Sequence, residues 1–341
     1  MPDPQNTRGP AMRDVAAAAG VSAQTVSRVL NDHPNVQDST RQRVLAVVEK
    51  LGYRRSYMAR ALVTGRSRTI GLLTLATNNY SRSSVALGIE RGARDAGYTV
   101  NSVASTLSSQ ALVDAVGRLV FQGVDGIILA TPLLEAGEQI RKLTERIPTI
   151  NTDGSVAWSD HLVGVDQDIS AEMATTHLLD LGHKTVWHVA GPAEWSDAAS
   201  RLNSWRRTLA EHGCEVPPEL HGDWSPESGY RNGIILGRMP EVTAILVASD
   251  EMAFGVLRAL AELGRRVPED VSVVGIDDID LAPYSNPPLT TIRQSFEDTG
   301  RRAVEHLVAI IANPQLASPP DLVAPTLVVR GSTAAPPAAA G

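Results

Sequence analysis

Short apolar runs alternate with amphipathic stretches of helical period from about residue 68 to about residue 330. Repeated βα units of this kind form parallel sheets that are covered by helices on both faces. About 265 residues exceed one such sheet, so we expect an α/β core of two doubly wound subdomains. Ligands of doubly wound sheets bind beyond the carboxyl ends of the strands, and two facing sheets make a cleft. The expected strands are Thr69–Leu75, Thr99–Ala104, Asp125–Ala130, Pro148–Asn151, His161–Val165, Thr185–Ala190, Val242–Val247 and Val271–Ile276.

Residues 11–55 have a different pattern and are expected to form a small all-α unit. A first helix ends where Gly20 breaks the apolar spacing. Ser22 then stands where a hydroxyl can cap a second helix over Ala23–Leu30. Two short helices around such a turn are typical of the helix-turn-helix motif, whose second helix enters the major groove of DNA.

A third helix, Thr40–Leu51, is expected to complete the core of this unit. Either Asp38 or Ser39 can cap its start, and Gly52 ends it. Four further glycines are expected to be left-handed C-caps in the core: Gly97, Gly182, Gly213 and Gly264.

Composition changes at both ends of the chain and between the two units. Pro/Ala/Gly-rich ends predict disordered tails, and a short helical stretch is expected to link the units. The expected segments are a tail at 1–10, the helix-turn-helix unit at 11–55, a hinge helix or linker at 56–66, the core at 67–330 and a tail at 331–341. Within the core, the N-subdomain is expected at about 68–165 and 295–323, and the C-subdomain at about 166–294 and 324–330.

The net charge of −7 is spread unevenly along the 341 residues. Residues 1–66 hold ten basic and five acidic residues, a net charge of +5. The remaining residues hold 21 basic and 33 acidic residues, a net charge of −12. This asymmetry predicts a basic module that meets nucleic acid and an acidic module with another task.

Several classes of protein are disfavoured by what the sequence lacks. Cys214 is the one cysteine, so a disulfide framework and a multi-cysteine metal site are excluded. No apolar run approaches the ~18 residues of a membrane helix, and no secretory signal is evident, so a cytoplasmic protein without a membrane partner is expected. The common motifs of nicotinamide, phosphate-loop, zinc-protease and serine-hydrolase sites are missing. We therefore expect neither catalytic residues nor a metal or cofactor.

Polar side chains at the start of the second helix are the candidates for reading DNA. Gln24 can pair with adenine, and Arg28 can donate two hydrogen bonds to guanine. Ala23 lies beside them on the outward face. Contacts with phosphates, which set register but not sequence, are expected from Ser22, Thr25, Ser27 and Asn31.

Residues 12–31, MRDVAAAAGVSAQTVSRVLN, closely resemble the headpiece of the lac repressor/galactose repressor family of bacterial transcriptional regulators. Further motifs follow in the family's order and extend the resemblance over roughly 11–330. They are Leu51-Gly52-Tyr53, Ala59-Arg60-x-Leu62, Ile70-Gly71, Val124-Asp125-Gly126-Ile127, Leu181-Gly182-His183, Ala190-Gly191-Pro192, Ser249-Asp250, Gly275-x-Asp277-Asp278 and Pro288-Leu289-Thr290-Thr291-Ile292. The resemblance implies a core like that of periplasmic sugar-binding proteins.

By this resemblance, we expect the protein to bind a palindromic operator as a homodimer and to act as a repressor. Paired hinge helices would lie in the minor groove, with Leu62 wedged between base steps, Ala59 allowing close approach and Arg60 reaching a phosphate. The Pro/Ala/Gly-rich C-terminal segment lacks the leucine-repeat helix that makes tetramers in this family. A dimer is therefore expected.

The resemblance also implies a small-molecule effector in the cleft. Positions that match the family's pocket are Asp153, Arg201, Trp224, Ser249, Asp277 and Phe296, and Tyr80 is expected to close the site. Carboxylates and a guanidinium suit vicinal hydroxyls, and an indole suits the apolar face of a pyranose.

A mono- or disaccharide effector is therefore favoured, with a purine or another metabolite as the alternative. A sugar-binding protein that does not act on DNA is a further alternative, which the intact recognition helix opposes. Whether the effector releases or promotes DNA binding stays open, as do the operator and the regulated genes.

Overall fold

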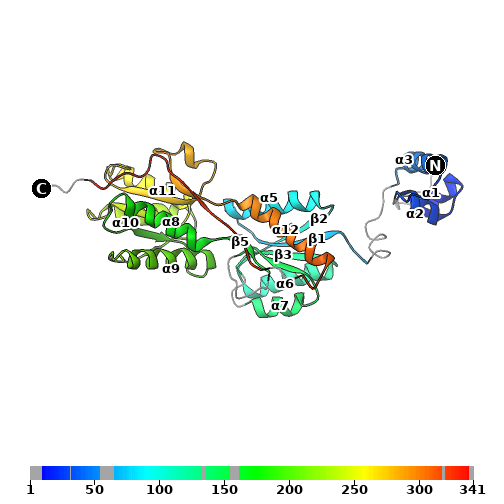
Figure 1. Cartoon of the computed structure of the whole chain (residues 1–341), viewed down its shortest axis with the longest axis horizontal. Helices are drawn as coiled ribbons and strands as arrows, with labels where there is room; N and C mark the ends of the chain where they lie inside the picture. Colours follow the sequence, from blue (N-terminus) through cyan, green and yellow to red (C-terminus); the bar gives the residue numbers. More distant parts are fainter. Residues whose placement is uncertain are drawn as a thin grey trace, which may run out of the picture. The chain divides into compact units, whose positions relative to one another are not determined.

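The computed structural model describes the chain in two compact units that meet between Ser67 and Arg68 (Figure 1). Each unit is described by itself. The described residues are 10–30, 32–53, 65–77, 79–132, 136–153, 161–316 and 319–337.

In its described part, the first unit has three helices around a small apolar core. They are α1 (Met12–Ala19), α2 (Ala23–Leu30) and α3 (Asp38–Leu51). Gly20 closes α1 with a φ of +64°, which is the left-handed conformation that glycine adopts without strain. The expected cap of α2 is confirmed, because the Thr25 N–H donates to Ser22 Oγ at 3.1 Å. Side chains buried between the helices are Val15, Ala16, Ala19, Val26, Val29 and Val44.

The start of α3 differs from the expectation. The helix begins at Asp38 and not at Thr40, and its N-cap residue is Gln37, whose side chain makes no capping hydrogen bond. Asp38 and Ser39 are thus inside the first turn. An acidic residue in that turn interacts favourably with the helix dipole, so Asp38 stabilises α3 through its charge instead of by capping.

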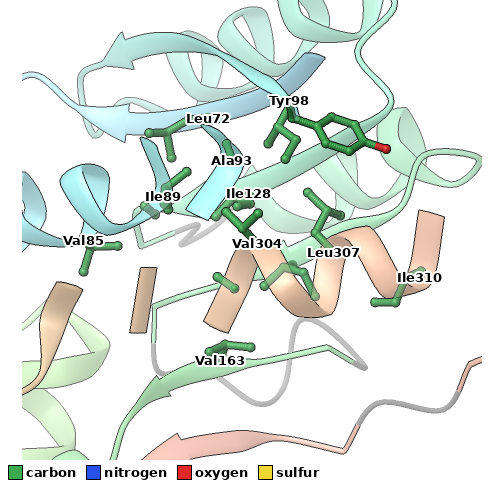
Figure 2. Close-up of a cluster of buried hydrophobic side chains, with 14 of the residues drawn as sticks. Leu72, Val85, Ile89, Ala93, Tyr98, Ile128, Val163, Val304, Leu307 and Ile310 are labelled. Carbon is green, nitrogen blue, oxygen red and sulfur yellow. The ribbon is translucent and has the colours of Figure 1, made fainter. Parts of the chain in front are cut away.

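In the second unit, a parallel sheet forms the first of two lobes, with strand order β2-β1-β3-β4. Its strands are β1 (Thr69–Leu75), β2 (Thr99–Ser105), β3 (Gly126–Ala130) and β4 (Thr149–Asn151). Its helices are α5 (Tyr80–Asp95), α6 (Ser109–Phe121), α7 (Gly137–Thr144) and α12 (Phe296–Ala312). One face of the sheet packs on α5 and α12, as the cluster in Figure 2 shows, and the other packs on α6 and α7. Alternate residues of β3 serve the two faces, Ile128 the first and Ile127 the second.

The second lobe has a six-stranded sheet in the described part of the chain, with order β12-β10-β9-β8-β6-β7. Its strands are β6 (Trp187–Ala190), β7 (Leu220–His221), β8 (Ala244–Val247), β9 (Ser272–Asp277), β10 (Thr290–Arg293) and β12 (Thr326–Val328). Its helices are α8 (Gln167–Asp180), α9 (Ser196–Glu211), α10 (Pro226–Gly237), α11 (Asp250–Glu262) and the short η3 (Ala282–Tyr284). α10 and α11 cover one face, and α8 and α9 cover the other. β12 runs antiparallel to β10, and the other pairs in the sheet are parallel.

The chain passes between the lobes at three places in its described part. The first follows β5 (Val163–Val165), the second follows β10, and the third follows β11 (Asp321–Val323). β5 and β11 pair with each other in a small parallel sheet beside the first lobe, against α12. The three passages bring the carboxyl ends of both large sheets toward the same region.

The predicted fold class is confirmed, since a helix-turn-helix unit precedes an α/β core of two largely parallel, doubly covered sheets. Each of the eight expected strands overlaps a strand of the structure. The four glycines expected as left-handed C-caps all have φ between +67° and +97°. The short strands β7, β10, β11 and β12 were not expected.

The expected disordered tail from residue 331 is wrong for residues 331–337. Ser332 is buried, its carbonyl accepts from the Val273 N–H at 2.8 Å, and its hydroxyl accepts from the Thr290 N–H at 2.8 Å. The Ala334 carbonyl accepts from Ser272 Oγ at 3.0 Å. Small residues let this segment lie close against the second lobe, so a composition typical of disorder here forms an ordered strap.

Across the residues that the structure describes, none of the helices combines the length and apolar character that spanning a membrane requires.

His188 of β6 is fully buried, and its burial makes the stability of the protein depend on pH. Its ring packs on Trp205 with centroids 5.2 Å apart, and Nδ1–H donates to the Leu246 carbonyl at 3.0 Å. Burial lowers its pKa to about 4 from the ordinary 6.5. The unfolded chain therefore binds more protons between these two values, and the free energy of unfolding falls as pH falls through this window. The expected loss from His188 alone is about 2 kcal/mol between pH 7 and pH 5.

Urea unfolding of the wild type and of His188→Asn at both pH values measures this effect. Asn keeps a donor near the position of Nδ1 but does not titrate. The variant should lack about 2 kcal/mol of the pH dependence. Burial raises the pKa of the Asp250 carboxyl to about 7, so this group makes the free energy of unfolding rise as pH falls. Its effect is the same in both proteins and cancels in the comparison. Equal pH dependence in the two proteins would contradict the prediction.

Candidate functional site

The outer surface of α2 carries the side chains that were predicted to read DNA. Ala23, Gln24 and Arg28 are exposed, while Val26 and Val29 anchor the opposite face in the core. The helix contains no acidic residue. This surface therefore presents an amide and a guanidinium, the two groups best suited to adenine and guanine in the major groove.

The residues predicted to contact phosphate differ in the hydrogen bonds and the exposure of their side chains. Ser22 Oγ and Thr25 Oγ1 are 2.9 Å apart and share a hydrogen bond, so both are partly occupied in capping the helix. Ser22 is exposed, and Thr25 and Ser27 are half-buried. The other predicted DNA contacts, Asn31, Ala59, Arg60 and Leu62, lie outside the described residues.

A small polar cavity, with about 20 Å³ open to a water-sized molecule, lies where strand ends of the two lobes face each other. Asp277 ends β9, Trp224 follows β7, and Arg201 projects from α9, which follows β6. The carboxyl ends of parallel strands are where doubly wound folds place their ligands. The lining residues are Asn79, Ser81, Arg82, Trp195, Asp197, Arg201, Trp224 and Asp277. We name this space the first cavity.

Arg201 lines the first cavity and contacts several of its other groups. The side chain is buried, Nε donates to Gln167 Oε1 at 2.8 Å, and Nη1 donates to the Ala248 carbonyl. Nη2 lies 3.8 Å from Asp277 Oδ1, too far for a direct hydrogen bond. The guanidinium also lies over the Trp224 ring, 5.7 Å from its centroid. Hydrogen bonds therefore hold Nε and Nη1 of the guanidinium, while Nη2 faces Asp277 without a direct hydrogen bond.

Two residues that line the first cavity each have a buried polar atom without a hydrogen-bond partner among the described residues, namely Asp277 Oδ1 and Trp224 Nε1. Asp277 and Trp224 also have φ of +123° and +71°, values that cost energy for residues other than glycine. Burial raises the pKa of Asp277 well above its usual value, against the opposing effect of Arg201. Strained backbone and buried polar atoms without protein partners are features that cluster at binding sites.

Arg82 of α5 forms the opposite side of the first cavity, and the sequence did not reveal it. Its Nη2 donates to Asp153 Oδ2 at 2.6 Å and lies 3.8 Å from an oxygen of Asp197, and its guanidinium lies over Trp195 at 5.0 Å. Burial alone would lower the pKa of Arg82, but Asp153 and Asp197 hold it above its usual value. Ser196 Oγ also donates to Asp153. Because Asp153 belongs to the first lobe and α9 to the second, these contacts join the lobes.

The remaining predicted effector residues lie at the edge of this arrangement or outside it. Asp153 contacts the cavity through Arg82. Tyr80 packs edge-on against Phe296, with centroids 6.4 Å apart, and its N–H donates to Glu251 Oε1 at 3.3 Å. Phe296 is buried in the core of the first lobe and lines a second, adjoining cavity. Ser249 is buried, and its hydroxyl caps α11 by accepting from the Met252 N–H at 3.3 Å. Among the described residues, Tyr80 and Ser249 do not line the first cavity.

Sequence reasoning missed Arg82, Trp195 and Asp197. A signal existed for two of them, because Asp197 stands four residues before Arg201 on one helix face and Trp195 precedes that helix. No such signal marked Arg82, whose partner Asp153 is 71 residues away in the sequence.

Two family models match the chain. One describes bacterial regulatory proteins of the lacI family and matches residues 11–56. The other describes a periplasmic binding protein-like domain and matches residues 175–333.

Similarity to individual proteins extends over nearly the whole chain. The ribose operon repressor of Escherichia coli (strain K12) is 31% identical over 329 residues, which are 94% of this chain and 99% of that protein. A crystal structure of the lac repressor dimer bound to operator and the anti-inducer ONPF superposes with a TM-score of 0.90 at 32% identity, covering 96% of this chain and 100% of that one. A complex of the transcriptional regulator CelR with cellobiose superposes with a TM-score of 0.71 at 29% identity, covering 95% and 99% of the two chains.

A helix-turn-helix unit joined to a ligand-binding α/β core defines a DNA-binding transcriptional regulator. The chain belongs to the lacI family of bacterial regulatory proteins, as its identity with the ribose operon repressor over almost their full lengths shows. The predicted family is thereby confirmed.

Proposed function

We propose that this protein is a repressor that binds a palindromic operator as a homodimer and is controlled by a small sugar in the first cavity. The observation that carries the sugar assignment is the unpaired Oδ1 of Asp277 facing Nη2 of Arg201, beside the ring and the unpaired Nε1 of Trp224. A hydroxyl group can donate to the carboxylate and accept from the guanidinium at once. The sugars in the names of the relatives, ribose and cellobiose, favour the same ligand class.

Neighbouring hydroxyls on a ring match this set of groups better than an anion does. Asp153, Asp197 and Asp277 surround the two guanidiniums, and the guanidiniums already have carboxylate partners. A phosphate or carboxylate ligand would therefore meet acidic side chains instead of unpaired cations. An uncharged polyol finds both hydrogen-bond donors and hydrogen-bond acceptors in this site, and Trp224 offers a flat face for its C–H groups.

The contacts between the lobes provide the route from effector to DNA. Ser196 and Asp197 reach Asp153 and Arg82 across the cleft, and Glu251 accepts from the Tyr80 N–H. A ligand that binds one arrangement of the lobes more tightly than another shifts the equilibrium between them by that difference in affinity. The linker to the DNA-binding unit leaves the first lobe just before β1, so the arrangement of the lobes in a dimer sets the spacing of two such units. Effectors coupled in this way commonly change DNA affinity by about 1–3 kcal/mol per coupling step.

The test combines operator binding and ligand binding in one experiment. The duplex is selected from random DNA with the wild-type protein, and binding is followed by fluorescence anisotropy over a range of salt concentrations. We expect a palindrome whose binding constant falls steeply as salt rises. Addition of sugars, with purines as the comparison class, should then change operator affinity for one sugar and for no purine. Selection that yields no common sequence would contradict the DNA-binding proposal, and a response to a purine alone would contradict the sugar.

The dimer proposal is supported by an exposed apolar surface on the second lobe. Leu281 and Tyr284 are 62% and 84% exposed, and they border a groove whose walls include Phe254 and Leu257 of α11. Large apolar side chains clustered at this exposure are typical of a protein interface. We name this surface the α11/η3 patch. Its self-association across a two-fold axis would bring two DNA-binding units to one palindrome.

Tyr284→Asp and Leu281→Asp each place a charge in the α11/η3 patch and should convert the dimer into a monomer. Operator affinity should fall by at least about 100-fold, because one unit reads only one half-site. Sedimentation velocity at micromolar concentration measures the change. Phe121→Asp, on α6 of the first lobe where Phe121 is 93% exposed, is the matched control and should stay dimeric. A wild-type tetramer, or dimeric patch variants, would contradict the proposal.

A further inference from the structure

Two buried glutamines pair with each other where the chain passes between the lobes. Gln167 is the first residue of α8, just after the passage that follows β5. Gln294 lies between β10 and α12, in the passage that leads back to the first lobe. The Gln167 Nε2–H donates to Gln294 Oε1 at 3.2 Å, and the Gln294 Nε2–H donates to Gln167 Oε1 at 3.0 Å. The pair thus joins two connections between the lobes, although its members are 127 residues apart in the sequence.

Burial makes this pairing costly to break. Gln167 is 8% exposed and Gln294 is 5% exposed. The Gln294 Nε2–H also lies within reach of Ser170 Oγ, at 3.4 Å, one turn along α8. A buried amide that loses its partner is left unsatisfied, because no water replaces the hydrogen bond. The two backbone segments are therefore held in one position relative to each other.

Arg201 sets the orientation of the paired amides. Its Nε–H donates to Gln167 Oε1 at 2.8 Å. Because a guanidinium can only donate hydrogen bonds, the oxygen of the Gln167 amide must face it, and the NH₂ group then faces Gln294. The reversed amide would bring two donors together at Arg201. A continuous chain of buried hydrogen bonds thus runs from the guanidinium of the first cavity to both connections.

We infer that Gln167 and Gln294 are positioning residues that transmit effector binding from Arg201 to the connections between the lobes. This role rests on the proposed control by an effector and goes beyond it, because it names the residues that carry the signal. A ligand held between Asp277 and Nη2 of Arg201 changes the angle of the guanidinium, and Nε then moves relative to Gln167. The paired amides pass this movement to the segments about which the lobes rotate. The ligand-bound arrangement of the lobes is thereby favoured over the other.

Hydrogen exchange followed by mass spectrometry tests this link on the full chain without any ligand. The four proteins compared are the wild type, Arg201→Lys, Gln294→Met and the double variant. Lysine keeps the charge but has a methylene in place of Nε, and methionine keeps the length of glutamine without its amide. The readout is exchange in peptides that contain Phe296, whose N–H donates to the Gln294 carbonyl at 3.0 Å.

Arg201→Lys should speed exchange at Phe296 by at least about 5-fold when Gln294 is present, and by less than about 2-fold in Gln294→Met. A glutamine that only stabilises the fold would give effects that simply add. Additive effects overturn the inference, and so does an Arg201→Lys variant with unchanged exchange at Phe296.

Two further variants control for effects on folding. Gln167→Met combined with Gln294→Met removes both amides, so neither glutamine is left as a buried group without its partner. This protein should also make exchange at Phe296 insensitive to Arg201→Lys, and it decides the test when Gln294→Met alone does not fold. Thr175→Val, the matched control on α8, removes a buried hydroxyl that donates to the Ala171 carbonyl at 2.7 Å. In that background the effect of Arg201→Lys should keep its full size.

Operator binding shows whether the link carries the signal of the effector. The probes are D-ribose, D-glucose, D-galactose, cellobiose, adenine and guanine, and the compound that changes wild-type operator affinity most is then used with the variants. Gln294→Met should bind this compound within about 5-fold of the wild type by calorimetry. Its operator response should fall from about 5–150-fold to less than about 2-fold, whereas Thr175→Val should respond like the wild type. A full response in Gln294→Met overturns the inference.

Failure of the proposed function gives a different result, which is seen in the wild type. A response to a purine alone contradicts the sugar and leaves the comparison of variants unchanged. A wild type that responds to none of the probes contradicts control by this class of effector, and the exchange measurement then decides whether Gln167 and Gln294 link Arg201 to the connections.

Discussion

Arg28→Ala is expected to weaken binding to the selected operator by roughly 30-fold to 10⁴-fold in a dimer. A guanidinium that donates two hydrogen bonds to guanine contributes about 1–3 kcal/mol of discrimination, and a palindrome is read by two such residues. Arg28 is exposed on α2, and its neighbours Val26 and Val29 hold the helix in the core. Truncation of an exposed side chain should leave the fold intact. Anisotropy with the operator and with a scrambled duplex of equal length measures the loss.

Affinity for the scrambled duplex should change far less, because phosphate contacts do not depend on sequence. Arg238→Ala removes the same charge from an exposed position after α10, in the other unit, and should leave both affinities unchanged. Effector binding should be normal in both variants. An equal loss on operator and scrambled DNA would mean that Arg28 contacts phosphate and does not read a base.

Arg201→Lys is expected to lower effector affinity by roughly 30-fold to 10³-fold while operator binding in the absence of effector is retained. Lysine keeps the positive charge beside Asp277 but loses the planar fork. It cannot hold Gln167 and the Ala248 carbonyl and still present a donor across from Asp277 Oδ1. Hydrogen bonds to charged groups contribute about 1.5–3 kcal/mol each, and the expected loss corresponds to one or two of them. Calorimetry with the tightest-binding sugar gives the affinity.

Arg207→Lys is the matched control, because it makes the same replacement on the same helix at a position directed away from the cavity toward Asp168 and Glu172. Effector affinity should be unchanged there. Operator binding by Arg201→Lys should also not respond to sugar at concentrations that weaken or strengthen operator binding by the wild type. Normal effector affinity in Arg201→Lys would remove Arg201 from the binding site.

Much of the fold could be predicted because buried strands have a strong sequence pattern. β1 and β3 are apolar along most of their length, since helices cover both faces of their sheet. β7, β11 and β12 have only two or three residues, over which a period is hard to recognise, although the equally short β4 and β5 were expected. The strap at 331–337 was misinterpreted because small residues fit close contacts as well as they fit disorder.

The candidate site was predictable where residues follow strand ends and less so where packing decides. Arg201, Trp224 and Asp277 come together because the strands β6, β7 and β9 all end at the same edge of one sheet. Ser249 also follows a strand, but the start of α11 uses its hydroxyl as a cap. Arg82 stands in the polar sequence of the first turn of α5, where an arginine is normally exposed. Its buried partner Asp153, which is distant in sequence, draws Arg82 into the site together with Asp197 and Trp195.

The three backbone passages between the lobes limit how this regulator can move. A single flexible connection would let one lobe reorient in every direction relative to the other. Three connections, after β5, β10 and β11, act together as a joint that permits rotation but resists sliding and separation. A ligand that binds between the lobes would therefore need to supply only the free energy of a rotation about these connections.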